Sequence, residues 1–139
     1  MMKTIRFLPP TAAVLAAAAG VAFAQPAAPA AAPAGKDVYE ANCAACHQED
    51  GKGIPGAFPA LAGDAFVTGD AAQPIGVVLE GRGGMPTFKD EMDDAHIAAA
   101  ISYIRTSWGN AATPVTPAAV AARRSGAMVP DKLSPLGAH

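Results

Sequence analysis

The sequence predicts an all-α domain of short helices joined by long loops. One segment carries large apolar side chains at spacings of four, three and four residues, which define one face of a helix. These side chains are Ile97, Ile101, Ile104 and Trp108. No stretch shows the alternation of apolar and polar residues that is typical of a half-buried strand. The 139 residues allow one small domain, and alanine, which buries little area, supplies much of the 51% apolar content. A small domain with so few large side chains needs a disulfide, a metal or a cofactor to stabilise it.

Residues 1–24 have the pattern of an export signal. Lys3 and Arg6 give a positive start, residues 11–23 form a short apolar run, and Ala22-Phe23-Ala24 fits a small-residue cleavage site. An uncleaved anchor is the alternative, but the run is shorter than the roughly 20 residues that span a bilayer. We therefore expect cleavage after this site and a mature chain that lies outside the cytoplasm.

The expected folded part of the chain is acidic. The formal net charge is −2 overall, and cleavage of the signal leaves 8 basic and 12 acidic side chains. Residues 35–108 hold 5 basic and 11 acidic side chains, a formal charge of −6. Such a surface excludes non-specific nucleic-acid binding, which needs a basic face. The length excludes a large enzyme, a multi-domain machine and a polytopic membrane protein.

The helices are expected within residues 35–109, in the following order. Residues 36–45 form a short helix candidate, whereas residues 51–70 carry five glycines and two prolines and are expected to be mostly loop. Residues 74–80 are long enough for a helix of two turns. Residues 93–107 are the strongest candidate, because an aspartate can cap their start and a glycine follows their end.

Proline and alanine dominate on both sides of this domain. Residues 25–34 (QPAAPAAAPA) contain no large apolar side chain and are expected to form a semi-rigid spacer. Residues 110–139 are a Pro/Ala-rich extension, in which a threonine cap followed by proline predicts a short helix over 117–124. We expect a mobile tail from Ser125 onward.

The chemistry is carried by one motif, Cys43-Ala44-Ala45-Cys46-His47. The C-x-x-C-H spacing is typical of covalent c-type haem attachment, in which two thiols bond to one edge of the porphyrin and the adjacent imidazole binds the iron. A disulfide between the cysteines would leave His47 unexplained. A thioredoxin-like pair needs a βαβ context, and a zinc site needs about four ligands. The motif therefore predicts one haem c, attached through Cys43 and Cys46, which also supplies the missing apolar volume.

Residues 35–108 resemble the small class I c-type cytochromes, particularly bacterial periplasmic ones and the cytochrome domains attached to exported dehydrogenases. Gly35 and Tyr39, eight and four residues before Cys43, match the family's glycine and aromatic at the crossing of its terminal helices. Tyr103 matches the aromatic that packs at the same crossing. The resemblance implies the class I cytochrome c fold, wrapped round one haem, and a periplasmic location.

The resemblance also implies roles for Pro59 and Leu61, twelve and fourteen residues after His47. In the family, a proline carbonyl at this place accepts the proximal histidine's N–H and a leucine packs on the haem. Such a partner fixes the tautomer and the ring orientation of His47.

Met85, in the glycine-flexed segment Gly83-Gly84-Met85-Pro86, resembles the family's distal ligand and is the expected second iron ligand. The alternative is that Met85 only packs in the hydrophobic core. Met92 and Met128 are weaker choices, and ligation by two histidines would need His96 or His139. Arg82 is expected either to be exposed or to approach a haem propionate. The acidic cluster over residues 90–94 is interpreted as a solvated helix start, favoured by the helix dipole.

A haem held by both His47 and Met85 has no open position for a substrate, so its chemistry is outer-sphere transfer of single electrons. We see no acid–base pair, activated nucleophile or phosphate loop, and we expect a periplasmic electron carrier of the respiratory chain rather than an enzyme. Its expected donor is a dehydrogenase or a quinol-oxidising complex, and its acceptor a terminal oxidase or reductase. Two alternatives are a fixed electron-accepting subunit of an exported alcohol or aldehyde dehydrogenase, and an enzyme or gas sensor with open iron.

Overall fold

A computed structural model describes residues 32–127 of the chain. The predicted export signal, most of the Pro/Ala spacer, Met128 and His139 lie outside these residues. The described part contains six α-helices and no strand, which confirms the all-α prediction. The helices are α1 (Gly35–Asn42), α2 (Ala44–His47), α3 (Ala65–Thr68), α4 (Ala72–Glu80), α5 (Asp94–Thr106) and α6 (Pro117–Arg124).

The single helix predicted over residues 36–45 is wrong, because the chain leaves helical geometry at Cys43 (φ −121°, ψ −34°). The Cys43 N–H still closes α1 on the carbonyl of Tyr39 at 2.8 Å. Its own carbonyl then accepts from the N–H of His47 at 2.9 Å and starts α2. The break leaves Cys43 between the two helices, whereas Cys46 lies within α2. Gln48 (φ +62°) ends α2 directly after the histidine.

Within the predicted loop over residues 51–70 lies one short helix, α3. The carboxylate of Asp64 caps it by accepting from the N–H groups of Phe66 (2.6 Å) and Val67 (3.2 Å). The next helix, α4, begins two residues earlier than predicted, since Asp70 accepts from the Ala72 N–H at 2.9 Å. Both helices lie beside the central helix, α5.

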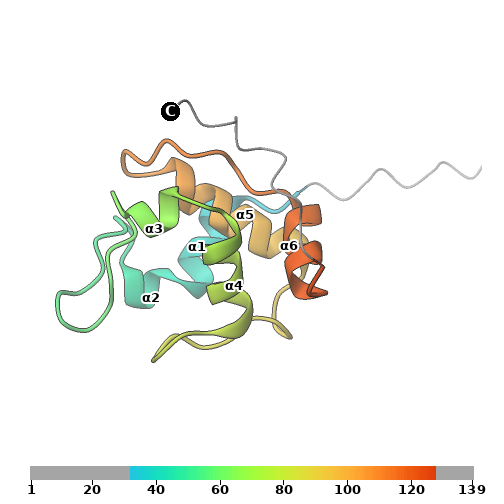
Figure 1. The fold of residues 1–139 in the computed structure, drawn as a ribbon. Helices are drawn as coiled ribbons and strands as arrows, with labels where there is room; N and C mark the ends of the chain where they lie inside the picture. The colour runs from blue at the N-terminus through green and yellow to red at the C-terminus, as the bar shows by residue number, and fades with distance from the viewer. Residues whose placement is uncertain (1–31, 128–139) are drawn as a thin grey trace, which may run out of the picture.

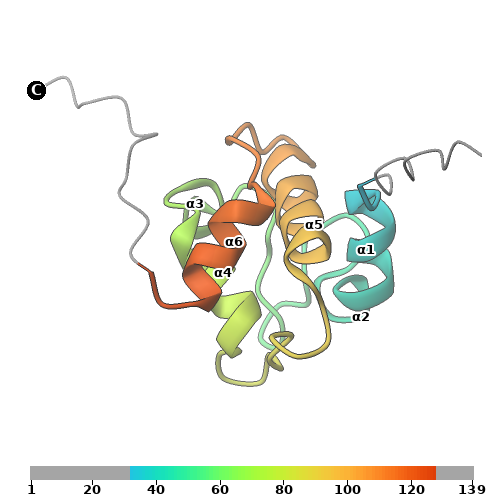
Figure 2. The same ribbon diagram turned by 90° about the vertical axis from the view of Figure 1, so that its right-hand side faces the viewer.

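The helix predicted over residues 93–107 is confirmed as α5, but Trp108, expected on its apolar face, lies beyond its end with φ +54°. Asp93 caps it by accepting from the His96 N–H at 2.8 Å. Ile97, Ile101 and Ile104 are all at most 8% exposed. Figures 1 and 2 show α5 between the α1–α2 side of the molecule and the layer of α4 and α6. The helix is therefore the common wall of the fold.

The close crossing of α1 and α5 depends on Gly35. A Cβ atom added there would lie 2.3 Å from the carbonyl oxygen of Ala99, so only glycine fits without a shift of backbone. Tyr39 is fully buried at this crossing, and its ring lies 5.4 Å from that of Tyr103 and 5.1 Å from that of Trp108. The glycine and the two tyrosines thus meet as the family resemblance implies.

Helix α6 packs against α4 and α5, and Val120 at its centre is fully buried. The hydroxyl of Thr116 caps it by accepting from the Ala119 N–H at 3.2 Å. Within the acidic cluster expected to be solvated, Asp94 is only partly exposed and pairs with Arg124 of α6. Within residues 32–127, no helix is long and apolar enough to cross a membrane.

Candidate haem site

The six residues expected to bind the haem or its iron line two adjoining cavities of about 120 and 200 Å³ between α2, α4, α5 and the loops. They are Cys43, Cys46, His47, Pro59, Leu61 and Met85. Apolar side chains from three helices form much of the remaining wall, among them Val67 of α3, Val77 of α4 and Ile101 of α5. The site therefore gathers residues from sequence positions 43 to 104.

The imidazole of His47 is held in one orientation. It is only 8% exposed, and its Nδ1 lies 2.9 Å from the carbonyl oxygen of Pro59. Because a carbonyl only accepts, Nδ1 carries the proton of the neutral ring and Nε2 keeps a lone pair. No hydrogen bond to Nε2 occurs among the described residues, and the ring lines both cavities. The histidine is thus prepared to bind a metal through Nε2.

The loop after α2 returns Pro59 to the histidine. Ile54 and Phe58 exchange backbone hydrogen bonds of 2.9 and 2.8 Å, which close a small hairpin. Gly53 (φ +63°) lies so close to this return that an added Cβ would be 2.5 Å from the carbonyl oxygen of Pro59. The Gly53 N–H also donates to the carbonyl of His47 at 2.9 Å. The carbonyl that orients the imidazole is therefore fixed by the same turn of chain.

The two cysteines are free thiols and are both partly buried. Burial, followed by the neighbouring thiol of Cys46, raises the pKa of Cys43 to about 11. At neutral pH this thiol is protonated. The side chains of Cys43 and Cys46 both line the second cavity, where they can reach one ligand together.

Met85 is placed by a tight two-residue turn. The backbone of Arg82 and Met85 is paired by hydrogen bonds of 3.2 and 3.0 Å, and Gly83 between them has φ +60°. The Met85 side chain is partly buried and lines both cavities. Arg82 is exposed and its guanidinium lies 4.6 Å from the centre of the Phe66 ring, a cation–π contact between the turn and α3.

The segment after Met85 is tied back to α4. The hydroxyl of Thr87 donates to the carbonyl of Leu79 at 2.5 Å, and the Phe88 N–H donates to the carbonyl of Val78 at 3.0 Å. These bonds fix the loop at the C-terminal end of the helix that carries Val77 and Val78 into the cavity wall.

Other candidate ligands among the described residues lie away from the cavities. Met92 packs against the core between α4, α5 and α6. His96 is exposed on α5, and its Nδ1 lies 2.7 Å from a carboxylate oxygen of Asp93. Neither residue lines the cavities that contain the cysteines.

Two buried polar residues beside the site were not predicted. Asn110 is 6% exposed; its Nδ2 donates to the carbonyls of Leu61 (3.0 Å) and Ile104 (2.8 Å), and its Oδ1 accepts from Gly63 N–H (2.8 Å). Arg105 is 4% exposed, and its guanidinium donates to the carbonyls of Val67, Gly69 and Thr113. No local pattern marks these residues, since most of their partners are distant in sequence.

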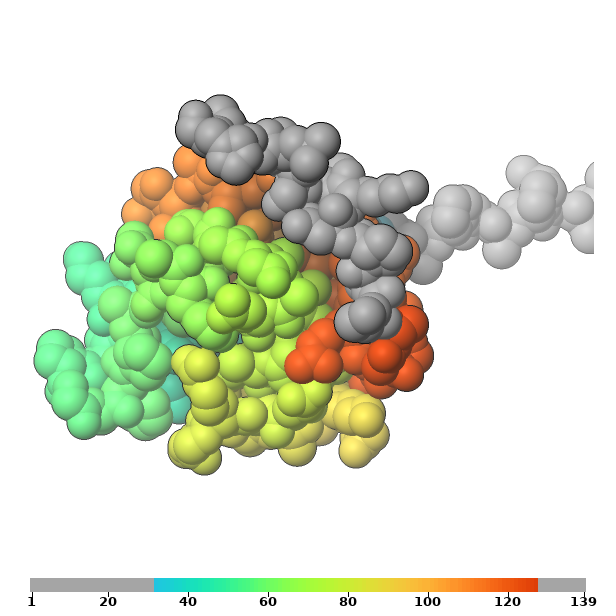
Figure 3. Space-filling model, viewed as in Figure 1, coloured from blue at the N-terminus to red at the C-terminus, as the bar shows by residue number. Residues whose placement is uncertain are grey.

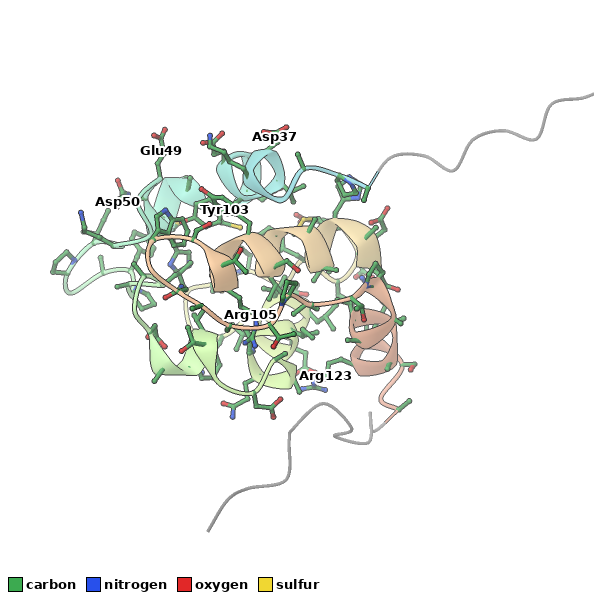
Figure 4. All side chains as sticks on the ribbon, turned by 90° about the horizontal axis from the view of Figure 1, so that it is seen from above. Asp37, Glu49, Asp50, Tyr103, Arg105 and Arg123 are labelled. Carbon is green, nitrogen blue, oxygen red and sulfur yellow. The ribbon has the colours of Figure 1, made fainter. Side chains whose placement is uncertain are left out.

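Arg105 keeps its buried charge with carbonyl partners. Burial is the main cause that lowers its pKa. Figure 4 shows Arg105 beneath α5, on the inner side of the molecule. The arginine ties the end of α5 to α3, whose Val67 lines the first cavity, and therefore fixes one wall of the site.

The surface near the site combines apolar and acidic groups. Ile54 and Phe58 of the hairpin are 41% and 37% exposed, and Phe58 also lines the second cavity. Asp37, Glu49 and Asp50 point away from the molecule along the α1–α2 side (Figure 4). The apolar tip thus adjoins the cavity that both cysteines line, and Asp50, four residues before Ile54, pairs with Lys52 at 2.8 Å.

The residues present fit a haem c. Two thiols separated by two residues, a histidine with a free Nε2 and a thioether all line one apolar site. This is the donor set of covalent haem in cytochromes c. Pro59 supplies the hydrogen-bond acceptor that a metal-binding histidine requires.

Comparison with known proteins agrees with this site. The family model described as "Cytochrome C oxidase, cbb3-type, subunit III" matches residues 30–104. Cytochrome c-552 of Thermus thermophilus is 38% identical over 92 residues, which cover 55% of this chain and 70% of that protein. The cytochrome c subunit of the alcohol dehydrogenase (quinone) of Gluconobacter oxydans (strain 621H) is 35% identical over 89 residues, 55% of this chain but only 19% of that subunit.

A solved structure, cytochrome c6 from the diatom Phaeodactylum tricornutum, has 29% sequence identity and a TM-score of 0.44, and the match covers 53% of this chain and 90% of that one. The family match spans more than half of the chain and includes the cysteines, the histidine and the crossing of α1 and α5. The chain therefore belongs to this family of c-type cytochromes, and its two cysteines have the spacing for one covalent haem c.

Proposed function

We propose that the iron of this cytochrome is bound by His47 and Met85, with the haem attached through Cys43 and Cys46. One observation carries the proposal: the two thiols, the imidazole and the thioether line the same pair of adjoining cavities, whereas Met92 and His96 do not. When bound, the haem supplies one-electron chemistry, because an iron with both axial positions filled transfers electrons without binding substrate.

The protein's own residues orient, tune and shield this centre. The Pro59 carbonyl holds the Nδ1 proton of His47 and so directs the lone pair of Nε2 toward the cavity. The Met85 thioether favours the reduced iron and raises the potential. Leu61, with apolar side chains of α3, α4 and α5, excludes water from the cavity. Low exposure of the ligands keeps the reorganisation of solvent small.

We propose that the carrier works outside the cytoplasm, in the periplasm, after removal of residues 1–24. This fits c-type cytochromes as a class, which are typically extracytoplasmic, and the export pattern of the sequence. Electrons would arrive from a dehydrogenase or a quinol-oxidising complex and leave to a terminal oxidase or reductase. The relatives support both ends, since they include a dehydrogenase subunit and a cbb3-type oxidase subunit.

The partner surface we propose is the tip formed by Ile54 and Phe58. It lies beside the cavity that holds both cysteines, and it is flanked by the acidic α1–α2 side. Such a surface fits a transient encounter with a partner that presents an apolar patch and basic groups.

A second candidate is a fixed electron-accepting subunit of an exported alcohol or aldehyde dehydrogenase. The similarity to the Gluconobacter oxydans subunit favours it, although the chain spans about a fifth of that subunit's length. Purification of the tagged protein from its own host separates the two. A stoichiometric large partner that survives gel filtration supports the fixed subunit, and a monomeric haem protein supports the free carrier.

The ligand assignment is tested by optical spectra of the haem-loaded protein and of Met85→Leu. Leucine keeps the volume of methionine, so the substitution removes little more than the sulfur. We expect the ferric protein to show the sulfur-to-iron charge-transfer band, Met85→Leu to lose it, and the matched control Met92→Leu to keep it. A high-spin spectrum in the unsubstituted protein, or loss of the band in Met92→Leu alone, would contradict the assignment.

A further inference from the structure

Helix α6 lies outside the residues matched by the family model, which end at 104, yet it contacts the segment that follows the Met85 turn. Figure 3 shows the red atoms of α6 against the yellow-green atoms of α4, and Figure 2 shows the helix crossing α4 beside α5. Helix α6 therefore lies next to a segment that supports Met85, one of the two proposed iron ligands.

Arg124, at the end of α6, makes three hydrogen bonds to this segment. Its Nε donates to a carboxylate oxygen of Asp94 at 2.8 Å, and its Nη2 donates to the carbonyl of Met92 at 2.9 Å. Its Nη1 donates to the carbonyl of Lys89. The side chain is 24% exposed and that of Asp94 is 31% exposed. A guanidinium with three partners in six residues of chain fixes that chain in one conformation.

The helix that presents Arg124 is itself well anchored. Val120 is fully buried in the core with α4 and α5. The hydroxyl of Ser102 on α5 donates to the carbonyl of Val115 at 3.0 Å and accepts from its N–H at 2.8 Å. The arginine is therefore held from a fixed platform, and its contacts stabilise the segment rather than follow its motion.

The segment from Lys89 to Asp94 is one of the two stems of the loop that carries Met85. The two residues before it are tied to α4, through the bonds from Thr87 and Phe88 to the carbonyls of Leu79 and Val78. Beyond residue 88, the carbonyls of Lys89 and Met92 are both bonded to Arg124. Loss of the arginine would leave these two carbonyls to solvent and remove the bonds between the stem and α6, while the N–H groups of Glu91 and Met92 stay bonded to the carbonyl of Phe88 at 3.2 and 3.0 Å.

We propose that Arg124 is a positioning residue that keeps the Met85 loop closed on the haem, and that α6 is the brace that holds it. The inference rests on the proposed ligation by Met85. Opening of the loop would withdraw the thioether from a bound haem, so the arginine, together with the Thr87 and Phe88 bonds, would limit the fraction of molecules with an open loop.

Arg123, the neighbouring residue, provides a matched control. Its Nη1 lies 3.2 Å from a carboxylate oxygen of Glu80, and its guanidinium covers Gly76 of α4. Both members of this pair are exposed, at 38% and 60% of their side-chain surface. Figure 4 shows Arg123 on the α4 side of α6. Replacement of this residue changes α6 at the neighbouring position but leaves the stem of the Met85 loop bonded.

The experiment is an imidazole titration of the ferric, haem-loaded protein, in which binding is monitored through the loss of the sulfur-to-iron charge-transfer band. Imidazole binds only molecules with an open loop, so its apparent affinity rises in proportion to the open fraction. For Arg124→Met we expect about tenfold tighter imidazole binding, because hydrogen bonds from a charged group to a partly buried stem are lost. For Arg123→Met we expect a change of less than about threefold, as for a surface ion pair. Arg124→Lys keeps the charge and should fall between them.

The outcomes separate this inference from the ligand assignment. Absence of the band in the unsubstituted protein would overturn the Met85 assignment itself. Presence of the band, with equal imidazole affinities for Arg124→Met and Arg123→Met, would overturn the role of Arg124 and leave the ligand assignment intact. Should Arg124→Met fail to fold, Arg124→Lys with an unchanged imidazole affinity would overturn it in the same way.

Discussion

Asn110 offers the sharpest test of how the cavity wall is held. Its side chain makes three hydrogen bonds, to the carbonyls of Leu61 and Ile104 and from the N–H of Gly63, and it is 6% exposed. Buried hydrogen bonds contribute about 1 kcal/mol each to the free energy of unfolding. Asn110→Ala removes three of them and leaves three backbone groups without this partner. We therefore expect a loss of about 3 kcal/mol.

The assay is unfolding of the haem-loaded protein in guanidinium chloride, monitored by far-ultraviolet circular dichroism. With a slope of about 3 kcal/mol per molar, the midpoint should fall by about 1 M. Asn42→Ala is the control, because Asn42 is exposed and donates one bond, to the carbonyl of Val38 at 2.8 Å. It should cost about 1 kcal/mol or less. Equal losses in the two variants would refute the assignment of Asn110 as the anchor of the Leu61 segment.

Two further predictions concern the crossing of α1 and α5. Gly35→Ala should destabilise the protein by about 2 kcal/mol in the same unfolding assay, because the new Cβ meets the Ala99 carbonyl; an unchanged midpoint would show that the helices separate freely. Burial raises the pKa of Tyr39 above its ordinary value near 10, so this tyrosine ionises more readily in the unfolded chain, and stability falls as pH rises above about 10. Tyr39→Phe removes the hydrogen bond to the Gln48 carbonyl, so its free energy of unfolding at pH 8 should be about 1 kcal/mol lower. Its unfolding midpoint should also decline less steeply between pH 9 and 11. Parallel declines in the two proteins would contradict the role of Tyr39.

The sequence predicts those helices whose ends and faces are encoded locally. For α5, Asp93 caps the start and the isoleucines recur at helical spacing. The Thr116–Pro117 pair marks the start of α6 in the same way. The break at Cys43 could not be predicted, because no proline or glycine marks it.

Some residues of the candidate site are likewise indicated by local sequence, whereas others depend on the fold. The cysteines and His47 lie within five residues, so spacing alone indicates the chemistry. The contact between His47 and the Pro59 carbonyl was implied only by family resemblance, since it depends on how the hairpin closes. Asn110 bonds to Gly63 and Leu61, which lie 47 and 49 positions before it in the sequence. A polar residue with such distant partners has no signature in a single sequence, because its environment is created by the fold.

Helix α5 links the candidate haem site to the hydrophobic core. Ile101 contributes both to the core shared with α4 and α6 and to the wall of the first cavity. Ile104 contributes both to the smaller core cluster that contains Tyr39 and to the wall of the first cavity. Atoms that pack on these side chains from the cavity side therefore add to the same apolar core, in a chain where large apolar residues are few. Any ligand that binds only the folded state stabilises it, so removal of covalent attachment by Cys43→Ala and Cys46→Ala would act on the whole fold and not on the site alone.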